Sequence, residues 1–285
     1  MRDFNESDIT AEVLKRNSGA SNERLRHVME CLVRHLHAFA RDTQLTEAEW
    51  LVGIQFLTRV GQICSVTRQE FILLSDTLGL SMLVDMINNH QPNRCTESTV
   101  LGPFHVEGAK EYPNGADIAN GAKGEPCLVR GTIRSSQGAP IGGAVVDVWQ
   151  ADADGYYDVQ YPTAERRARG VLRSDADGRF WFWSVLANKY PIPHDGPVGE
   201  MLAVLNRHPW RPAHLHFLIE APGFRRLVTH VFRAGDPYLE SDAVFAVRTL
   251  LIADWIRHAP GTAPDGSRRQ TPFYTLDFAF VLAET

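Results

Sequence analysis

The sequence predicts a mainly β protein with an α-helical N-terminal part: helices over residues 1–97, then an antiparallel β-sandwich over residues 98–285. Two observations predict this division. Before about residue 100 apolar residues recur at helical spacing, whereas later the chain alternates short apolar stretches with Gly, Pro and Asp turns. At 285 residues the chain can bury a substantial core, in one large domain or two smaller ones.

The N-terminal part contains three predicted helices, at residues 21–41, 46–64 and 67–89. Thr46 with Glu49, and Thr67 with Glu70, have the spacing of a capping box, so each pair predicts a helix start. The apolar faces of these helices must be buried against the sandwich, a second subunit, or both. The first helix carries an apolar stripe at steps of three and four residues, formed by Leu25, Val28, Met29, Leu32, Val33 and Leu36.

The C-terminal part contains short stretches with the composition of strands, bounded by turn residues. The segments SQGAP and SDADGR separate strand candidates and are typical of hairpin turns. Regular spacing of this kind predicts a sandwich of two sheets. The clearest strand candidates are residues 127–135, 144–152, 179–185, 213–220, 225–232 and 273–283.

Composition and charge exclude several classes of function. The net charge of -5 and the lack of a basic run argue against a nucleic-acid partner. Four widely spaced cysteines without a C-x-x-C pair argue against a thiolate zinc site and a disulfide framework. The N-terminus has no apolar run, and no stretch is long enough to span a membrane. These features predict a cytoplasmic protein.

The segment RPAHLHF, residues 211–217, is the strongest chemical signal in the sequence. Residues two apart on a strand point to the same face, so His214 and His216 would form a chelating pair. His35 and His37 share the spacing but lie in a helical pattern, where such residues do not face each other. On spacing alone, the strand pair is equally consistent with a metal site and with hydrogen-bonded core histidines.

Tyrosines near this strand candidate suggest which metal it would bind. Tyr156 and Tyr157 lie in GYYDVQ, and Tyr190 lies in KYPIPHDGP. A phenolate is a hard anionic donor that suits Fe(III), and two phenolates with a hydroxide balance the charge of a trivalent ion. Balanced charge makes burial of the site tolerable. For any single tyrosine, a packed aromatic side chain remains the simpler interpretation.

Ordered motifs over residues 100–250 resemble the intradiol ring-cleavage dioxygenases. They are LGPF, GTI, VVDVWQADADGYYDVQ, SDADGRFWFWSV, YPIPHDGPVG, RPAHLHF, TH and GDPYLESDAVF. Within the catechol-type branch, the sequence is most similar to hydroxyquinol 1,2-dioxygenases, with chlorocatechol and catechol 1,2-dioxygenases as alternatives. The resemblance implies an enzyme that inserts both atoms of O2 into an ortho-diol ring, converting hydroxyquinol to maleylacetate.

The resemblance also implies a cofactor and the roles of individual residues. Fe(III) would be bound by Tyr157, Tyr190, His214 and His216. Tyr157 matches the motif rather than Tyr156, because the family's tyrosine directly precedes the aspartate, here Asp158. Arg211 falls on the catalytic arginine, and Tyr190 would also accept a substrate proton. His230 falls beside the iron, where catechol enzymes often have Gln, which favours the hydroxyquinol branch.

The substrate pocket is likewise implied by the resemblance. Asp76 is its polar member: it is either a helix cap or turn residue, or the acceptor for a third ring hydroxyl. The remaining positions predict an apolar slot for a flat ring. With Asp76 and His230, the pocket residues are Leu73, Val100, Leu101, Gly102, Pro103, Phe104, Ile192, Pro193 and Val244.

The helical part resembles the dimerisation domain of the catechol-type branch. This implies a homodimer formed through residues 1–97, with grooves that can hold a lipid between subunits. Two other functions compete with the iron enzyme. One is a zinc or Fe(II) enzyme in which a carboxylate joins the His pair; the other is a β-sandwich binding module without catalysis.

Overall fold

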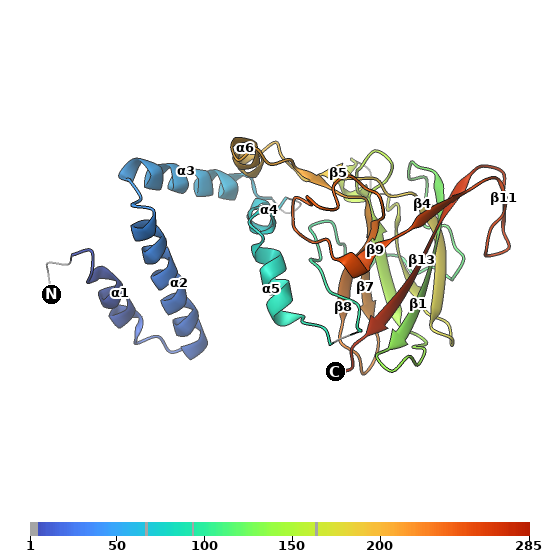
Figure 1. The fold of residues 1–285 in the computed structure, drawn as a ribbon, viewed down its shortest axis with the longest axis horizontal. Coiled ribbons are helices and arrows are strands. Elements are labelled where there is room, and N and C mark those ends of the chain that lie inside the picture. Colours follow the sequence, from blue (N-terminus) through green and yellow to red (C-terminus); the bar gives the residue numbers. More distant parts are fainter. Residues whose placement is uncertain (1–4, 66–67, 93, 163–164) are drawn as a thin grey trace. The chain divides into compact units, whose positions relative to one another are not determined.

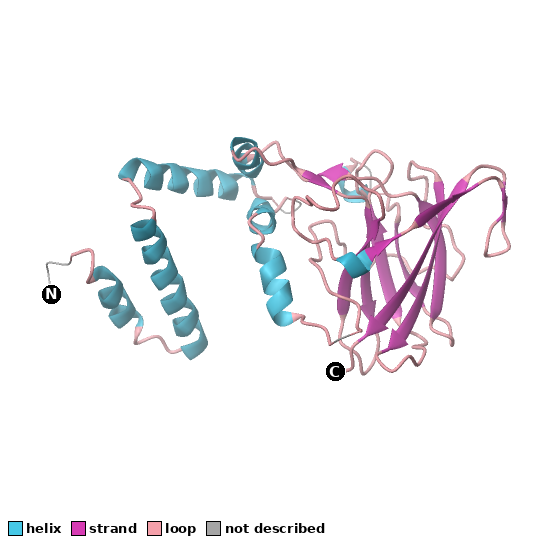
Figure 2. Ribbon diagram, in the orientation of Figure 1, coloured by secondary structure: helices cyan, strands magenta, loops and turns pink. Residues whose placement is uncertain are grey.

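The computed structural model describes residues 5–65, 68–92, 94–162 and 165–285. The chain forms two compact units, Met1–Arg59 and Val60–Thr285. Helices dominate the first ninety residues and strands dominate the rest (Figure 2), which confirms the predicted fold class. The domain division at residue 97 remains a prediction. Within the described residues, no helix is long and apolar enough to cross a membrane.

The first unit contains α1 (Ile9–Asn17), α2 (Glu23–Asp42) and most of α3 (Glu47–Ile63) (Figure 1). The capping box at α3 is confirmed: the Glu49 carboxylate accepts from the Thr46 amide and hydroxyl at 2.9 and 2.8 Å. Helix α1 was not predicted. It contacts α2 through the Thr10 hydroxyl, which lies 2.9 Å from His37 Nδ1 and accepts from Arg41 at 2.7 Å.

The apolar stripe of α2 is largely exposed. Asn22 caps this helix by accepting a hydrogen bond from the Leu25 amide at 2.9 Å. The stripe is therefore presented by a well-formed helix, but five of its six side chains keep between 37% and 54% of their surface exposed. These exposed side chains are Leu25, Val28, Met29, Leu32 and Leu36.

The third predicted helix is two helices, α4 (Glu70–Thr77) and α5 (Leu80–Asn88). The break falls at Gly79, whose φ of 75° lies in the left-handed region that interrupts an α-helix. Thr67 lies outside the described residues, so its predicted capping box has no structural counterpart to examine. The Glu70 carboxylate pairs with Arg68 at 2.9 Å and accepts from the Val198 amide at 3.2 Å, at the start of α6 (Pro197–Val204).

The second unit is built on two sheets (Figure 1). One has the order β10-β13-β1-β4, with β1 (Pro126–Ser135), β4 (Arg179–Val185), β10 (Trp255–His258) and β13 (Phe273–Leu282). The other has the order β3-β2-β7-β8-β9, with β2 (Val145–Gln150), β3 (Arg169–Arg173), β7 (His214–Glu220), β8 (Leu227–Arg233) and β9 (Ile252–Ala253). Most pairs are antiparallel, but β1 pairs with β13, and β8 with β9, in parallel.

Shorter elements complete the second unit. Strand β5 (Tyr190–Pro191) pairs with β6 (Trp210–Arg211), which places Tyr190 opposite Arg211. Strand β11 (Gly261–Thr262) pairs with β12 (Arg268–Arg269). Two 3-10 turns are also described: Asp158–Gln160 lies between β2 and β3, and Thr249–Leu251 directly precedes β9.

The core lies between the two sheets and backs the strand that carries the His pair. Phe217 on β7 contacts Phe280 on β13 and Phe180 on β4, with ring centroids 4.8 and 6.3 Å apart. The segments SQGAP and SDADGR are turns, as predicted, and SQGAP closes a short hairpin in which Arg134 and Pro140 form an antiparallel bridge. Each one connects strands of different sheets, β1 to β2 and β3 to β4, so the chain crosses the core there.

Candidate metal centre

Strand β7 brings His214 and His216 to one face, as the spacing predicts. Their Nε2 atoms lie 3.2 Å apart, and both side chains are buried. His214 Nδ1 lies 2.7 Å from the Pro212 carbonyl oxygen, which can only accept a hydrogen bond. The His214 Nδ1 therefore carries the proton, and its Nε2 presents a lone pair to the space in front of the strand.

Two tyrosines converge on the same point from other elements. The Tyr157 hydroxyl, just after β2, lies 2.9 Å from His216 Nε2 and 3.4 Å from His214 Nε2. Tyr190 comes from β5, and its ring lies 5.3 Å from the Tyr157 ring and 5.6 Å from the His214 ring. The four side chains predicted to bind iron are thus brought together, although they are separated by up to 59 residues in sequence.

Burial favours the neutral forms of these groups in the metal-free protein. Burial, followed by the nearby Arg211, holds the pKa of His214 well below its usual value, and burial also lowers the pKa of His216. Burial and then Tyr190 raise the Tyr157 pKa well above its usual value, against a lowering by Arg211. Neutral imidazoles are ready ligands, whereas a phenolate needs a strongly polarising cation. This donor set therefore fits a highly charged metal ion such as Fe(III).

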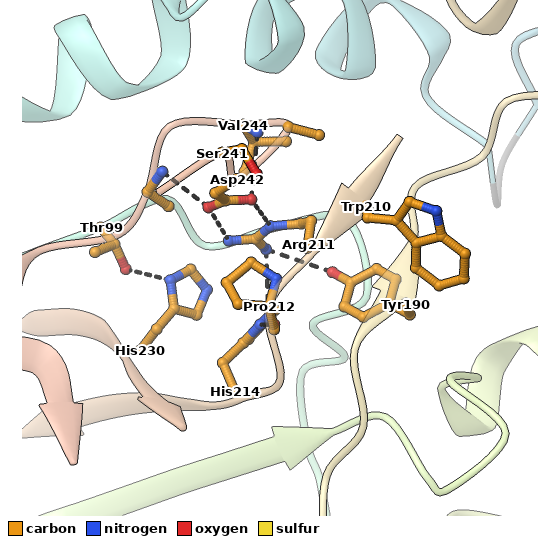
Figure 3. A network of polar contacts seen from close by, with 12 residues as sticks. Thr99, Tyr190, Trp210, Arg211, Pro212, His214, His230, Ser241, Asp242 and Val244 are labelled. Carbon is orange, nitrogen blue, oxygen red and sulfur yellow. Dashed lines mark hydrogen bonds and ion pairs between the residues drawn. The ribbon is translucent and has the colours of Figure 1, made fainter. Parts of the chain in front are cut away.

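The third histidine of the cluster, His230, contacts His216 on the side away from Tyr157. His214, His216 and His230 place ligand atoms within 4.8 Å of one another. His230 Nε2, however, lies 2.8 Å from His216 Nδ1, the nitrogen opposite the one that faces Tyr157. The other ring nitrogen of His230, Nδ1, lies 2.7 Å from the Thr99 hydroxyl (Figure 3).

Arg211 lies beside the centre, held by a carboxylate that the sequence analysis did not single out. Asp242 accepts from Arg211 Nε at 2.9 Å and from Nη2 at 3.2 Å (Figure 3). The remaining Nη1 points toward the Tyr190 hydroxyl at 3.4 Å and His214 Nε2 at 3.3 Å. Burial lowers the Arg211 pKa, but the charge and hydrogen bonds of Asp242, together with the nearby Tyr190 and Tyr157, outweigh it, and the pKa is raised. The site thus holds a permanent, fixed positive charge.

A cavity of about 760 Å³ lies within the second unit between the α4 and α5 helices and the loop before β1. Of the predicted pocket residues, Asp76, Val100, Leu101 and Gly102 line this cavity. Burial raises the pKa of the Asp76 carboxyl, against opposing contributions from Ser81 and Arg211.

The other predicted pocket residues lie outside the lining of that cavity. Phe104 stacks on the Tyr157 ring with centroids 4.4 Å apart, so it borders the metal centre directly. The Val244 amide lies 3.4 Å from the Asp242 carboxylate. Leu73, Ile192, Val244 and His230 are buried, whereas Pro193 is half-buried and Pro103 is exposed.

Comparison with known protein families identifies the family to which this chain belongs. A family described as dioxygenase matches residues 100–283, and the catechol dioxygenase N terminus matches residues 22–96. The chain belongs to the intradiol dioxygenase family. It is therefore an enzyme of that family rather than a sandwich module without catalysis. Among the described residues, the His cluster contains no carboxylate, unlike the site of the competing zinc or Fe(II) enzyme.

Several relatives match this dioxygenase over all or nearly all of its length. A 6-chlorohydroxyquinol 1,2-dioxygenase from Cupriavidus pinatubonensis is 57% identical, covering 100% of both chains. A hydroxyquinol 1,2-dioxygenase from Nocardioides simplex is 48% identical, covering 98% of this chain and 95% of its own. The solved hydroxyquinol 1,2-dioxygenase from Pseudomonas putida DLL-E4 has a TM-score of 0.92 at 46% identity, covering 98% and 99% of the two chains.

Several residues that support the centre of this dioxygenase were missed in the sequence. Arg169 on β3 donates to the Asp158 carboxylate at 2.6 Å and to the Phe104 carbonyl at 2.7 Å, all three groups being buried. It thereby fixes the residue after Tyr157 and the ring that stacks on Tyr157. Trp149 on β2 stacks on His216 with ring centroids 4.7 Å apart. No local pattern reveals such partners, because Trp149 meets His216 through sheet pairing, and Arg169 reaches Asp158 and Phe104 through the tertiary fold.

Proposed function

We propose that this dioxygenase opens the ring of hydroxyquinol between its adjacent hydroxyls, inserts both atoms of O2, and releases maleylacetate. Two kinds of evidence support this assignment: full-length relatives bearing that name, and the convergence of Tyr157, Tyr190, His214 and His216 in one buried site. The relative at 57% identity adds a chlorinated hydroxyquinol as a second candidate substrate of the same class. Catechol and chlorocatechols are the alternatives.

The proposed cofactor is Fe(III), bound by Tyr157, Tyr190, His214 and His216. When bound, a trivalent iron would supply a Lewis acid that favours phenolates, and would activate an ortho-diol toward O2. Two phenolate donors would offset most of its charge, and two imidazoles would add ligands without adding charge. A buried cation needs such compensation, because an unpaired charge in a low-dielectric interior is costly.

The protein's own groups then divide the remaining work. Tyr190 Oη would accept one proton from the incoming diol, and its distance of 3.4 Å from Arg211 Nη1 keeps it within the field of a fixed cation. Arg211 would stabilise the negative charge that develops on the ring, since its orientation is set in advance by Asp242. The buried walls around the centre would exclude water from the reacting ring.

Substrate preference is tested by measuring oxygen uptake by the iron-loaded protein with hydroxyquinol, 6-chlorohydroxyquinol, catechol and a chlorocatechol. We expect the two hydroxyquinols to dominate, with maleylacetate or its chlorinated counterpart as the product. A reaction without enzyme is the necessary control, because hydroxyquinol autoxidises. Equal or faster uptake with catechol would assign the enzyme to the catechol branch instead.

Asp76 is the proposed acceptor for the third ring hydroxyl. It is a largely buried carboxyl in the 760 Å³ cavity and shares that wall with Val100 and Leu101. Replacing Asp76 with Ala should lower kcat/KM for hydroxyquinol by about 10- to 100-fold, since a hydrogen bond to a charged group contributes about 1.5–3 kcal/mol. The value for catechol should change little, because catechol has no third hydroxyl.

Asp85 provides a matched control for that experiment. It is a second carboxylate on the same cavity, and it accepts from the Ser98 hydroxyl at 2.9 Å. Replacing Asp85 with Ala should leave the ratio of hydroxyquinol to catechol activity unchanged. If Asp76→Ala lowers both activities equally, Asp76 has only a structural role.

A second copy of the chain is the proposed partner of the N-terminal helices. The exposed apolar stripe of α2 supports a homodimer, and the grooves of such helices would suit a lipid chain. Light scattering should give twice the mass of 31.9 kDa, and mass spectrometry of an organic extract would identify any lipid. A monomer at micromolar concentration would contradict the proposed dimer.

A further inference from the structure

The ring of His216 is constrained on three sides. Trp149 stacks on one face, with centroids 4.7 Å apart and an angle of 16° between the planes. Gly102 passes the ring edge so closely that a Cβ there would lie 3.1 Å from His216 Cε1. His230 Nε2 lies 2.8 Å from His216 Nδ1. Packing thus fixes where the ring lies, and the hydrogen bond to His230 determines where its proton sits.

The two histidines of β7 differ in what holds their Nδ1 atoms. The Nδ1 of His214 faces a carbonyl oxygen, so only one tautomer is possible. The Nδ1 of His216 faces another imidazole, which can donate or accept. If His230 Nε2 donated, His216 would carry its proton on Nε2, the atom that faces Tyr157, and could not bind a metal there.

If His216 Nε2 is to bind a metal, the protons along the contacts from His216 through His230 to Thr99 can be arranged in only one way. His216 Nδ1 must donate to His230 Nε2, which leaves the His230 proton on Nδ1. That proton then needs an acceptor, and the Thr99 hydroxyl lies 2.7 Å away. Thr99 is itself held beside β8, the strand that carries His230, because its amide donates to the Val228 carbonyl at 2.9 Å.

We propose that Thr99 and His230 are positioning residues that hold His216 in the tautomer whose Nε2 is free to bind the metal. The proposal rests on the proposed metal centre. It replaces a substrate-binding role for His230, because both ring nitrogens of this fully buried side chain are engaged, by His216 and by Thr99. A glutamine could serve in its place, since an amide accepts through its oxygen and donates through its nitrogen.

Four variants test the positioning role: Thr99→Val, Thr99→Ser, His230→Leu and His230→Gln. Iron affinity is measured by competition with a chelator, and the phenolate-to-iron absorption band is recorded for each loaded protein. Thr99→Val and His230→Leu should weaken iron binding by about 10- to 100-fold, the range typical for losing a partner of a metal-bound histidine. Thr99→Ser and His230→Gln should stay within about threefold of wild type.

A second His–Thr pair in the same fold supplies matched controls. His258 Nε2 on β10 lies 2.9 Å from the Thr275 hydroxyl on β13, in the other sheet. His258→Leu and Thr275→Val should therefore leave iron affinity unchanged. Thermal unfolding of every metal-free variant identifies any that fail to fold, and Thr99→Val decides the question if His230→Leu is among them.

Each outcome has a distinct meaning. Wild-type protein that binds no iron would refute the metal centre itself. Wild-type protein that binds iron while Thr99→Val and His230→Leu bind it equally well would overturn the positioning role alone. A His230→Gln variant as weak as His230→Leu would also overturn it, because the amide preserves both hydrogen bonds. Weakening in Thr99→Val with recovery in Thr99→Ser would support it.

Discussion

Replacement of Arg211 by leucine is expected to lower kcat by about 100- to 1,000-fold, the loss typical of removing one preorganised electrostatic group. Iron should remain bound, because Arg211 lies beside the proposed ligands and is not one of them. Its Nη1 lies 3.3 Å from His214 Nε2 and 3.4 Å from the Tyr190 hydroxyl, so it faces the place where charge would develop. The measurements are steady-state oxygen uptake and iron content on the same sample.

The same substitution should also destabilise the fold, for a reason separable from catalysis. It leaves the Asp242 carboxylate buried without its cation, and breaking a buried pair on one side costs about 3–5 kcal/mol. Arg211→Leu combined with Asp242→Leu should restore much of the stability and none of the activity. Recovery of activity in the double variant would remove Arg211 from the chemistry.

Arg207 offers a matched control on the same side of the unit. It donates to the Thr77 carbonyl at 2.8 Å and lies over the Phe245 ring, without touching the proposed ligands. Arg207→Leu should change kcat by less than about threefold, because Arg207 has no contact with the reacting groups. A loss as large as that of Arg211→Leu would mean that general damage to this region explains both effects.

Replacement of Tyr157 by phenylalanine is expected to weaken iron binding more than about 100-fold and to abolish most of the visible charge-transfer absorption. Removing a group that only hydrogen-bonds to a metal ligand typically lowers metal affinity about 10- to 100-fold. Tyr157→Phe goes further, because it removes one of the two proposed anionic donors. Iron affinity should fall because a single remaining phenolate would leave the positive charge of a buried trivalent ion poorly compensated. Chelator competition and the visible spectrum provide the two measurements.

Tyr156 is the natural control, because it precedes Tyr157 directly and is 52% exposed. Tyr156→Phe should leave both the colour and the iron affinity unchanged. If Tyr156→Phe loses the colour and Tyr157→Phe keeps it, the motif has been aligned one residue out of register. A colourless wild-type protein containing zinc would contradict the Fe(III) assignment as a whole.

The predictable part of the site is the part whose geometry is local. The period of a strand places His214 and His216 on one face, and the six strand candidates all coincide with strands of the sheets. The break at Gly79 was not predicted, because a single glycine is tolerated in many helices. Helix α1 was missed because nine residues are too short for an apolar periodicity to be distinctive.

The supporting groups could not be predicted, because they lie in loops that only the tertiary fold brings to the strands of the site. Asp242 reaches Arg211 across 31 residues, and Thr99 reaches His230 across 131. Neither sequence neighbourhood contains a pattern that names its partner. The roles of the four ligand candidates came from resemblance to a family, and the geometry is what makes those roles chemically reasonable.

The parallel pairing of β1 with β13 has a consequence for when the proposed metal centre can form during synthesis. Cys127 pairs with Tyr274, so the two inner strands of this sheet, β1 and β13, come from segments that the ribosome synthesises at well-separated times. Phe280 on β13 also supports Phe217, the residue that follows His216 on β7. Such long-range pairing forms slowly. Both histidines are therefore synthesised before their backing strand exists, and the proposed metal centre cannot gain that support until translation has passed residue 282.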